Sequence, residues 1–262
     1  MWGWRSSRTI ALSAAVAAFA VFCVLPFAYM VARWLSESER LTSSLIVLLD
    51  SRQRGLLLNT AVLGAGTAFA ATLVGAPLGV ALARMTLPFK PGLRILLAAP
   101  ALLPSYVVGL AWLYLGSSTW TRSIPGGVIV LTVAFYPLSM LTTEAAVRAV
   151  EPRLEEAAAL AATPIRVLGR ITLPLVLPSI LAAALVVFVL AISDFGVPAL
   201  LRVRVFTTEI FTAFAALYDP VRATALALPL LVLSLLVALM SVRLTGDRLV
   251  ARRRGLAGDL QT

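Results

Sequence analysis

The sequence has 262 residues, of which 60% are hydrophobic and only 13% are charged, and its mean hydropathy is +0.97. A soluble domain of this size needs far more polar side chain for its surface, so these values exclude an ordinary soluble protein. The net charge of +10 comes from basic residues between long apolar runs and on the C-terminal tail. That placement suits contact with anionic lipid headgroups and argues against nucleic acid as a partner.

Six uncharged runs divide the chain, and each is at least as long as the roughly 20 residues that cross a bilayer as a helix. Backbone groups find no water in hydrocarbon, so each run should be helical. The sequence therefore predicts an all-α integral membrane protein with about six transmembrane helices, forming a single transmembrane domain over residues 1–262. The runs cover 9–32, 57–83, 95–121, 123–143, 171–193 and 223–242.

The first run follows Arg5 and Arg8, as the core of a secretory signal would. It spans about 24 residues, however, which is longer than the roughly 7–15 residues of such a core. No small-residue cleavage pattern is obvious at its end. We therefore expect a retained helix.

The segment after the first run contains an apolar stretch at 41–49 that is too short to cross a bilayer. We expect it to lie as a helix at the membrane interface. In the second run, Asn59 and Thr60 stand near the start and could cap the helix through side-chain oxygens. Further along, Gly75 and Gly79 are four residues apart, which permits a close contact with another helix.

Prolines interrupt the third and fourth runs: Pro100 and Pro104 lie in the third, and Pro137 lies in the fourth. Each proline removes a helix donor and should kink the chain or open a local gap. Kinked helices around a central cavity suit a protein that alternates between two openings, although membrane helices also tolerate proline without such a role. Pro104 and the pair Tyr136-Pro137 are therefore candidates for a translocation path.

The fifth run ends at Ser193 and is followed directly by an acid, Asp194. An acid within a span usually faces a cavity or a partner. This one stands near the end of the run, where water can reach it. Two roles stay open for it, a structural or interfacial role and a place on the substrate path beside Ser193.

A polar, alanine-rich segment separates the fourth and fifth runs. Pro152 suits the first position of a helix, and Glu155 and Glu156 fall in the first turn, where the helix dipole favours negative charge. Thr163 followed by Pro164 indicates a cap and a first-turn proline, which open a second short helix. The pattern predicts a helix-turn-helix whose small side chains allow it to enter a groove on a partner.

The distribution of Lys and Arg orients the chain. With the N-terminus inside, most of the basic residues fall on the inner side, so both termini and the 147–172 loop are expected in the cytoplasm. These inner residues are Arg5, Arg8, Arg84, Lys90, Arg94, Arg148, Arg153, Arg166, Arg170, Arg243, Arg248, Arg252, Arg253 and Arg254.

Residues 155–174 resemble the EAA loop of the permease subunits of binding-protein-dependent ABC importers. The pattern of that loop is approximately E-A-A, three residues, G, nine residues, then I-x-L-P. The departures here are Glu156 in place of alanine and Ala161 in place of glycine. The resemblance implies ATPase coupling for Glu155, Glu156, Ala157, Leu160, Ala161, Thr163, Pro164, Ile171, Leu173 and Pro174.

The resemblance implies an ABC importer permease of the type I fold in the inner membrane of a bacterium or archaeon. Its loop would dock on ATP-binding cassette ATPase subunits, with Glu155 pairing with a basic or amide group there. An extracytoplasmic binding protein would deliver the solute, and a second permease copy or paralogue would complete the pair. The chain itself would carry no cofactor, metal or catalytic residue. The stretches 193–200 and 207–210 look most like ferric-iron permeases, which implies ferric iron as the substrate.

Two other classes stay open on the residues alone. An ATPase-independent secondary transporter or channel would favour inverted repeats and buried charges, and neither is clear in this sequence. An integral membrane enzyme should bring several polar catalytic residues together, and the chain contains no histidine. ATP dependence of uptake separates the importer from the secondary transporter.

Overall fold

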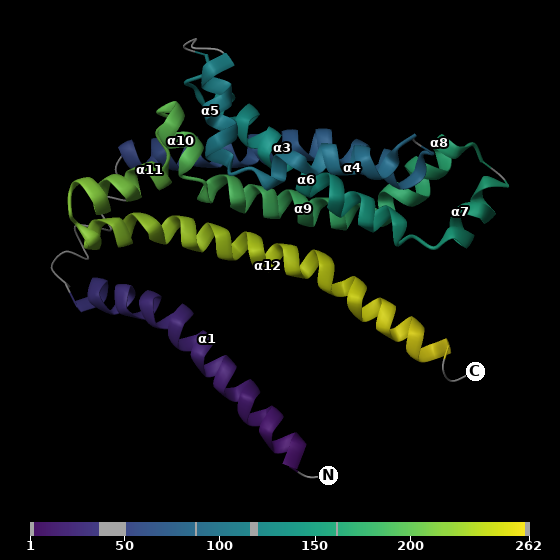
Figure 1. Cartoon of the computed structure of the whole chain (residues 1–262), viewed down its shortest axis with the longest axis horizontal. Coiled ribbons are helices and arrows are strands. Elements are labelled where there is room, and N and C mark those ends of the chain that lie inside the picture. Colours follow the sequence, from purple (N-terminus) through teal and green to yellow (C-terminus); the bar gives the residue numbers. More distant parts are fainter. Residues whose placement is uncertain (1–2, 37–50, 87, 116–119, 161, 260–262) are drawn as a thin grey trace. The chain divides into compact units, whose positions relative to one another are not determined.

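A computed structural model describes residues 3–36, 51–86, 88–115, 120–160 and 162–259, and in these ranges helices joined by short turns make up the chain, as predicted (Figure 1). The expected interfacial helix at 41–49 lies outside the described residues. The helices are α1 (Gly3–Ser36), α3 (Ser51–Arg84), α4 (Lys90–Ala98), α5 (Ser105–Leu115), α6 (Ile124–Arg148), α7 (Pro152–Ala159), α8 (Pro164–Val167), α9 (Leu173–Ser193), α10 (Gly196–Leu201), α11 (Phe206–Phe211) and α12 (Pro220–Asp259). A 3-10 turn at Ala99–Leu102 and π-helical turns at Leu168–Thr172 and Thr212–Ala216 join some of them.

The chain forms two compact units. The smaller comprises Met1–Arg54 and Glu209–Leu228, and the larger comprises Gly55–Thr208 and Pro229–Thr262. In the smaller unit, Asp219 sets the start of α12 because its carboxylate accepts a hydrogen bond from the Arg222 amide at 3.0 Å. The proline that follows Asp219 needs no such partner at a first helical position.

Four helices of the described chain are long and apolar enough to cross a membrane, or five if one bent pair counts as a span. The first predicted run lies within α1, whose described apolar part, Leu12–Leu25, is shorter than a span. The number of six spans therefore stays a prediction. The four long helices are Gln53–Arg84, Ile124–Arg148, Pro164–Ser193 and Pro220–Arg243.

The third predicted run is not one helix. Its two parts, Lys90–Leu102 and Ser105–Leu115, are bent by 93° relative to each other. The break falls at Leu103, which is extended (φ −92°, ψ 136°) and stands directly before Pro104. A residue before proline is disfavoured in the helical region, and the proline has no N–H to continue the ladder. The bend at this break agrees with the interruption that the prolines predict.

The second predicted span begins earlier than expected. Helix α3 starts at Ser51, so Asn59 and Thr60 lie in its interior and do not cap it. The Asn59 side-chain amide donates instead to the carbonyl oxygen of Arg204 at 3.0 Å. The buried Thr60 hydroxyl bonds the Leu56 carbonyl at 2.7 Å and accepts from the Phe206 amide at 3.0 Å. Asn59 therefore anchors the segment before α11, and Thr60 anchors the first residue of α11.

In the larger unit, α3 packs against α6 and α9 (Figure 1). Gly75 and Gly79 bring α3 against the backbone of α6, because a Cβ on Gly75 would lie 2.5 Å from the Tyr136 carbonyl oxygen. The predicted close contact is confirmed. The buried side chains of the main core come from α3, α6, α9, α10 and the segment after α10: Leu63, Val130, Leu131, Ala191, Val197, Leu201, Val203 and Val205.

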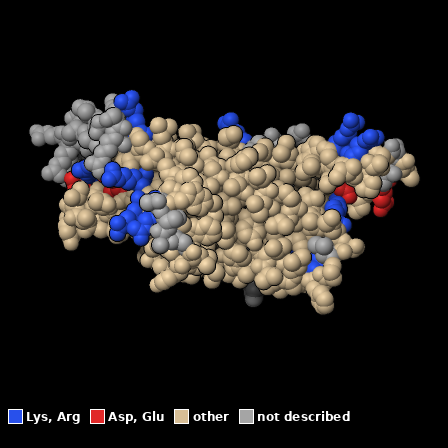
Figure 2. All heavy atoms as spheres, turned by 90° about the horizontal axis from the view of Figure 1, so that it is seen from above, with Lys and Arg blue, Asp and Glu red and all other residues tan. Residues whose placement is uncertain are grey.

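The surface agrees with a protein that spans a membrane. On the face shown in Figure 2, uncharged residues cover most of the surface and charged side chains are few. Many large apolar side chains on the long helices are exposed, among them Phe69 on α3 and Leu235 on α12. Lipid tails rather than water suit such side chains.

Candidate functional site

The polar segment between α6 and α9 forms the predicted helix-turn-helix. Helix α7 begins at Pro152, after Glu151 in an extended conformation, and Glu155 lies in its first turn. Helix α8 begins at Pro164, after Thr163, which is also extended. The Thr163 side chain makes no capping hydrogen bond, so only the backbone part of the predicted cap is present.

Helix α8 continues into α9 through a π-helical turn, Leu168–Thr172. The amide of Leu173 bonds the carbonyl of Leu168, five residues back, instead of the residue four back. Pro174 follows, and a proline clashes with the carbonyl four residues before it, so a wider turn at this point relieves the clash. Ile171 is half-buried in the turn, while Leu173 and Pro174 are exposed at the start of α9.

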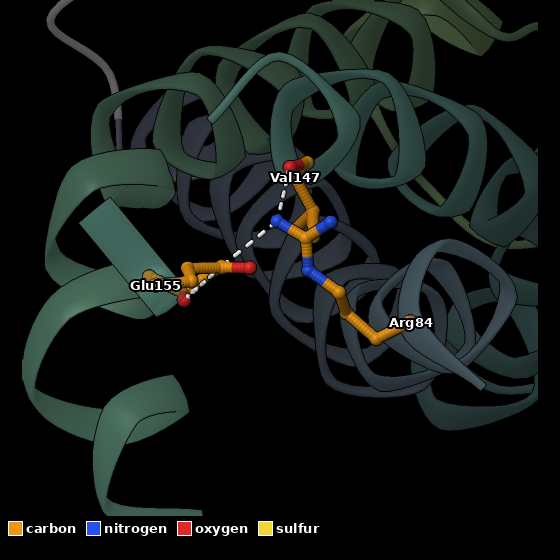
Figure 3. A network of polar contacts seen from close by, with 4 residues as sticks. Arg84, Val147 and Glu155 are labelled. Atoms are coloured by element: carbon orange, nitrogen blue, oxygen red, sulfur yellow. Dashed lines mark hydrogen bonds and ion pairs between the residues drawn. The ribbon is translucent and has the colours of Figure 1, made fainter. Parts of the chain in front are cut away.

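Glu155 is bound within this chain. Its Oε1 atom accepts from Arg84 Nη2 at 2.8 Å and from the Thr172 hydroxyl at 2.6 Å. The same Arg84 nitrogen also donates to the Val147 carbonyl oxygen at 3.0 Å, as Figure 3 shows. The side chains of Arg84 and Glu155 are 33% and 19% exposed. We call these four residues, Arg84, Val147, Glu155 and Thr172, the loop latch.

The latch gives Glu155 partners within its own chain. Its Oε1 atom accepts from an arginine and a hydroxyl of the permease itself, and the expected pairing with a basic or amide group on a partner protein stays a prediction. A half-buried carboxylate without such partners would be costly, and here the chain supplies them itself. The other predicted acid, Glu156, is exposed.

The outer surface of the loop is apolar at three points. The side chain of Leu160, at the end of α7, is 91% exposed, Ile165 on α8 is 78% exposed, and Leu154 on α7 is 51% exposed. Ile165 also lines a cavity of about 470 Å³, whose walls come from α8, the π-helical turn and the latch. We call Leu154, Leu160 and Ile165 the loop apolar patch.

The remaining predicted loop residues fall around this patch. Thr163 and Pro164 are exposed between Leu160 and Ile165. Ala157 lies within α7. Ala161 lies outside the described residues, so the shape of the turn at the position of the family glycine stays a prediction.

Asp194 joins the C-terminal end of α9 to two other elements. Its carboxylate accepts from the Ser105 hydroxyl, at the start of α5, and from the Val197 amide at 2.9 Å, in the first turn of α10. Its carbonyl accepts from the Thr207 hydroxyl at 3.1 Å. These contacts favour the structural role that the sequence left open, and a place on the substrate path is untested. The neighbouring Ser193 is exposed.

Three other residues were predicted for the translocation path: Tyr136, Pro137 and Pro104. The Tyr136 hydroxyl donates to the Leu97 carbonyl of α4 at 2.8 Å, and Pro137 is buried within α6. Pro104 is exposed at the break between α4 and α5, next to the residue that binds Asp194. Pro104 therefore adjoins a contact of Asp194 in the sequence, whereas Tyr136 contacts α4.

Sequence reasoning missed Glu144 altogether. This acid of α6 has a side chain only 2% exposed and pairs with Arg94 of α4 at 3.1 Å and with Arg148 one turn later at 2.6 Å. With the Tyr136 bond, the Arg94 pair fastens α4 to α6, while the Arg148 pair lies within α6. One signal was present in the sequence, because Glu144 interrupts the end of an apolar run four residues before Arg148.

The chain is similar in sequence to known membrane transport proteins. The model of the family described as "Binding-protein-dependent transport system inner membrane component" matches residues 75–247. The molybdate/tungstate transport system permease protein WtpB of Thermococcus kodakarensis is 31% identical over 196 residues, which cover 73% of this chain and 77% of the relative. The Fe(3+)-transport system permease protein FbpB 2 of Haemophilus influenzae is 25% identical over 226 residues, which cover 86% of this chain but 44% of that protein.

Solved structures show the same arrangement of helices. A bacterial ABC transporter involved in the import of the acidic polysaccharide alginate superposes with a TM-score of 0.68 at 16% identity, covering 92% of this chain and 99% of the other. The inward-facing MetNI methionine ABC transporter superposes with a TM-score of 0.64 at 18% identity, covering 74% of this chain and 96% of the other. At these identities the likeness shows the fold alone.

Proposed function

The chain belongs to the family of binding-protein-dependent transport system inner membrane components, and from this premise we propose that the α7–α8 loop is where an ATPase subunit drives it. The chain is a multi-pass permease subunit of an ABC importer with the type I fold. In this proposal residues 1–262 act as one permease domain, and the 147–172 loop couples it to ATP hydrolysis.

The loop apolar patch carries the proposal. Leu154 and Leu160 belong to the polar segment between two apolar runs, and Ile165 is followed by the exposed Arg166, so water rather than lipid surrounds this surface. Full burial of one such side chain against a partner contributes about 1.5–3 kcal/mol. A protein surface that covers the patch therefore supplies much of the affinity expected of a stable subunit contact.

The proposed assembly follows from this arrangement. ATP-binding cassette ATPase subunits cover the patch from the cytoplasm, where both termini of the permease also lie, and they alone hydrolyse ATP. A second permease copy or paralogue completes the membrane pair, and an extracytoplasmic binding protein delivers the solute. One structural neighbour was solved in complex with an alginate pentasaccharide-bound periplasmic protein, which supports such a partner here.

For the substrate we propose a metal oxyanion, molybdate or tungstate. The WtpB relative supports this choice because it matches at 31% identity along 77% of its own length. Ferric iron is the second candidate, favoured by the FbpB 2 match across 86% of this chain and by the resemblance at 193–210. Uptake of labelled molybdate, tungstate and ferric iron in cells with and without the gene decides between them. Loss of iron uptake with unchanged molybdate uptake would reject the oxyanion.

Docking is tested by replacing Leu160 with Asp and measuring co-purification with the ATPase subunit. An aspartate cannot occupy an apolar groove, so the affinity should fall by about tenfold to a hundredfold, as the loss of about 1.5–3 kcal/mol requires. Leu160→Met keeps an apolar side chain of similar size and should bind normally. The side chain is 91% exposed, so neither change should disturb the fold. Normal binding by Leu160→Asp would refute this docking surface.

A further inference from the structure

The loop latch links elements that are distant in sequence. Arg84 ends α3, Val147 lies in the last turn of α6, Glu155 lies on α7, and Thr172 ends the π-helical turn before α9. One guanidinium nitrogen of Arg84 bonds both Val147 and Glu155, and one carboxylate oxygen of Glu155 bonds both Arg84 and Thr172. The ends of three long helices and the loop therefore meet at a single pair of charges.

Chain connectivity alone would not join α7 to α3. Helix α7 continues from α6 through Ala149–Glu151 and leads to α8 through Leu160–Thr163, so its covalent neighbours are α6 and α8. Arg84 lies 71 residues from Glu155 in sequence, and this ion pair is a direct polar connection between α7 and α3. A force applied to α7 reaches α3 by this route.

The electrostatic setting strengthens the connection. The Glu155 side chain is 19% exposed, and the hydroxyl that it accepts belongs to Thr172, a residue only 1% exposed. Hydrogen bonds to ionised groups are shorter and stronger than those between neutral groups, and they strengthen further where water is largely excluded. The hydrogen bonds of the latch are therefore stronger than those of an ion pair that is fully exposed to water.

We propose that Arg84 is a positioning residue that transmits the movement of the ATPase-docked α7 to the end of α3. The inference rests on the proposed docking of the loop. Docking uses the outward apolar patch, whereas transmission uses the inward charge pair, and the two can be separated by mutation. Without the latch, the ATPase would still bind and hydrolyse ATP, but the movement of α7 would reach α3 only in part.

The experiment uses the assembled importer in proteoliposomes with its binding protein, and compares Arg84→Gln, Glu155→Gln and the charge exchange Arg84→Glu with Glu155→Arg. Solute import per ATP hydrolysed should fall by about fivefold or more in each single variant, while co-purification with the ATPase is unchanged. The charge exchange restores the ion pair and should recover much of the ratio. Arg243→Gln, which removes an exposed arginine of α12, should have no effect.

Three results would overturn the inference. In the single variants, solute import and ATP hydrolysis could fall in equal proportion, so that import per ATP hydrolysed stays unchanged. The charge exchange could also give no higher import per ATP hydrolysed than the single variants. If the single variants do not assemble while the exchange both assembles and transports, the pair is only a folding contact. The docking proposal has its own test. If it is right, Leu160→Asp reduces co-purification with the ATPase, independently of what the latch variants show.

Discussion

Because α3 and α6 pack closely at Gly79, we predict that a larger residue there destabilises the permease. An alanine there would place its Cβ 2.4 Å from the Met140 carbonyl oxygen and 2.8 Å from the Thr143 Cβ. The nearest of these is a backbone atom of α6, so no side-chain rotation removes the clash. Gly79→Ala must therefore separate the two helices at the centre of the larger unit.

The magnitude follows from two opposing effects. Forcing an extra methyl group into a packed interior costs about 1–3 kcal/mol, and a backbone clash lies toward the upper end. Alanine recovers about 1 kcal/mol through its higher helix propensity than glycine. We therefore expect a net destabilisation of about 1–2 kcal/mol. Gly92 on α4 is the matched control, because nothing lies within 4 Å of a Cβ there.

The assay heats the purified permease in detergent and measures unfolding by size-exclusion chromatography, as the loss of the folded peak with temperature. Gly79→Ala should lower the midpoint by about 2–8 °C, on the usual conversion for a protein of this size. Gly92→Ala should leave it unchanged or raise it. Equal midpoints for the two variants would show that α3 and α6 do not pack as closely as described, and would refute the reasoning.

Three further predictions concern other parts of the molecule. Asp194→Ala removes the acceptor for the Val197 amide and should cost about 1 kcal/mol of stability. A large loss of transport by a stably folded Asp194→Asn would instead support a place for Asp194 on the substrate path. Glu144→Gln removes the buried negative charge that pairs with Arg94 and Arg148 and should lower thermal stability, measured against the exposed Glu151→Gln. Equal stability would contradict a stabilising role of these ion pairs. Cysteines at positions 122 and 160 should label from opposite sides of the membrane, with 160 cytoplasmic, and labelling of 160 from outside would reverse the orientation.

Local chemistry allowed much of the fold to be predicted. Pro152 and Pro164 set helix starts because the effect of a first-turn proline does not depend on distant residues. The spacing of Gly75 and Gly79 predicted a close helix contact, since small residues four apart share one helix face. The prolines of the third run predicted an interruption, but the 93° angle depends on what each arm packs against, and sequence spacing does not contain that.

The polar partners could not be predicted in the same way. Glu155 was correctly placed on its helix, but its partner Arg84 lies 71 residues earlier, and only the fold brings the two together. The same holds for Glu144 and Arg94, which belong to different helices. Asn59 and Thr60 were assigned to a cap because their side chains favour that position, and tertiary contacts to the segment before α11 prevailed instead.

Cross-linking from position 160 tests the central claim, that the α7–α8 loop meets the ATPase, most directly. In a chain whose native cysteine is replaced by Cys23→Ser, Leu160→Cys should form a cross-link to the ATPase subunit through a short bifunctional reagent in the assembled importer. Arg122→Cys, which the predicted orientation puts on the opposite side of the membrane, should form none. A cross-link from 122, or none from 160 in a complex that retains its ATPase, would contradict the account.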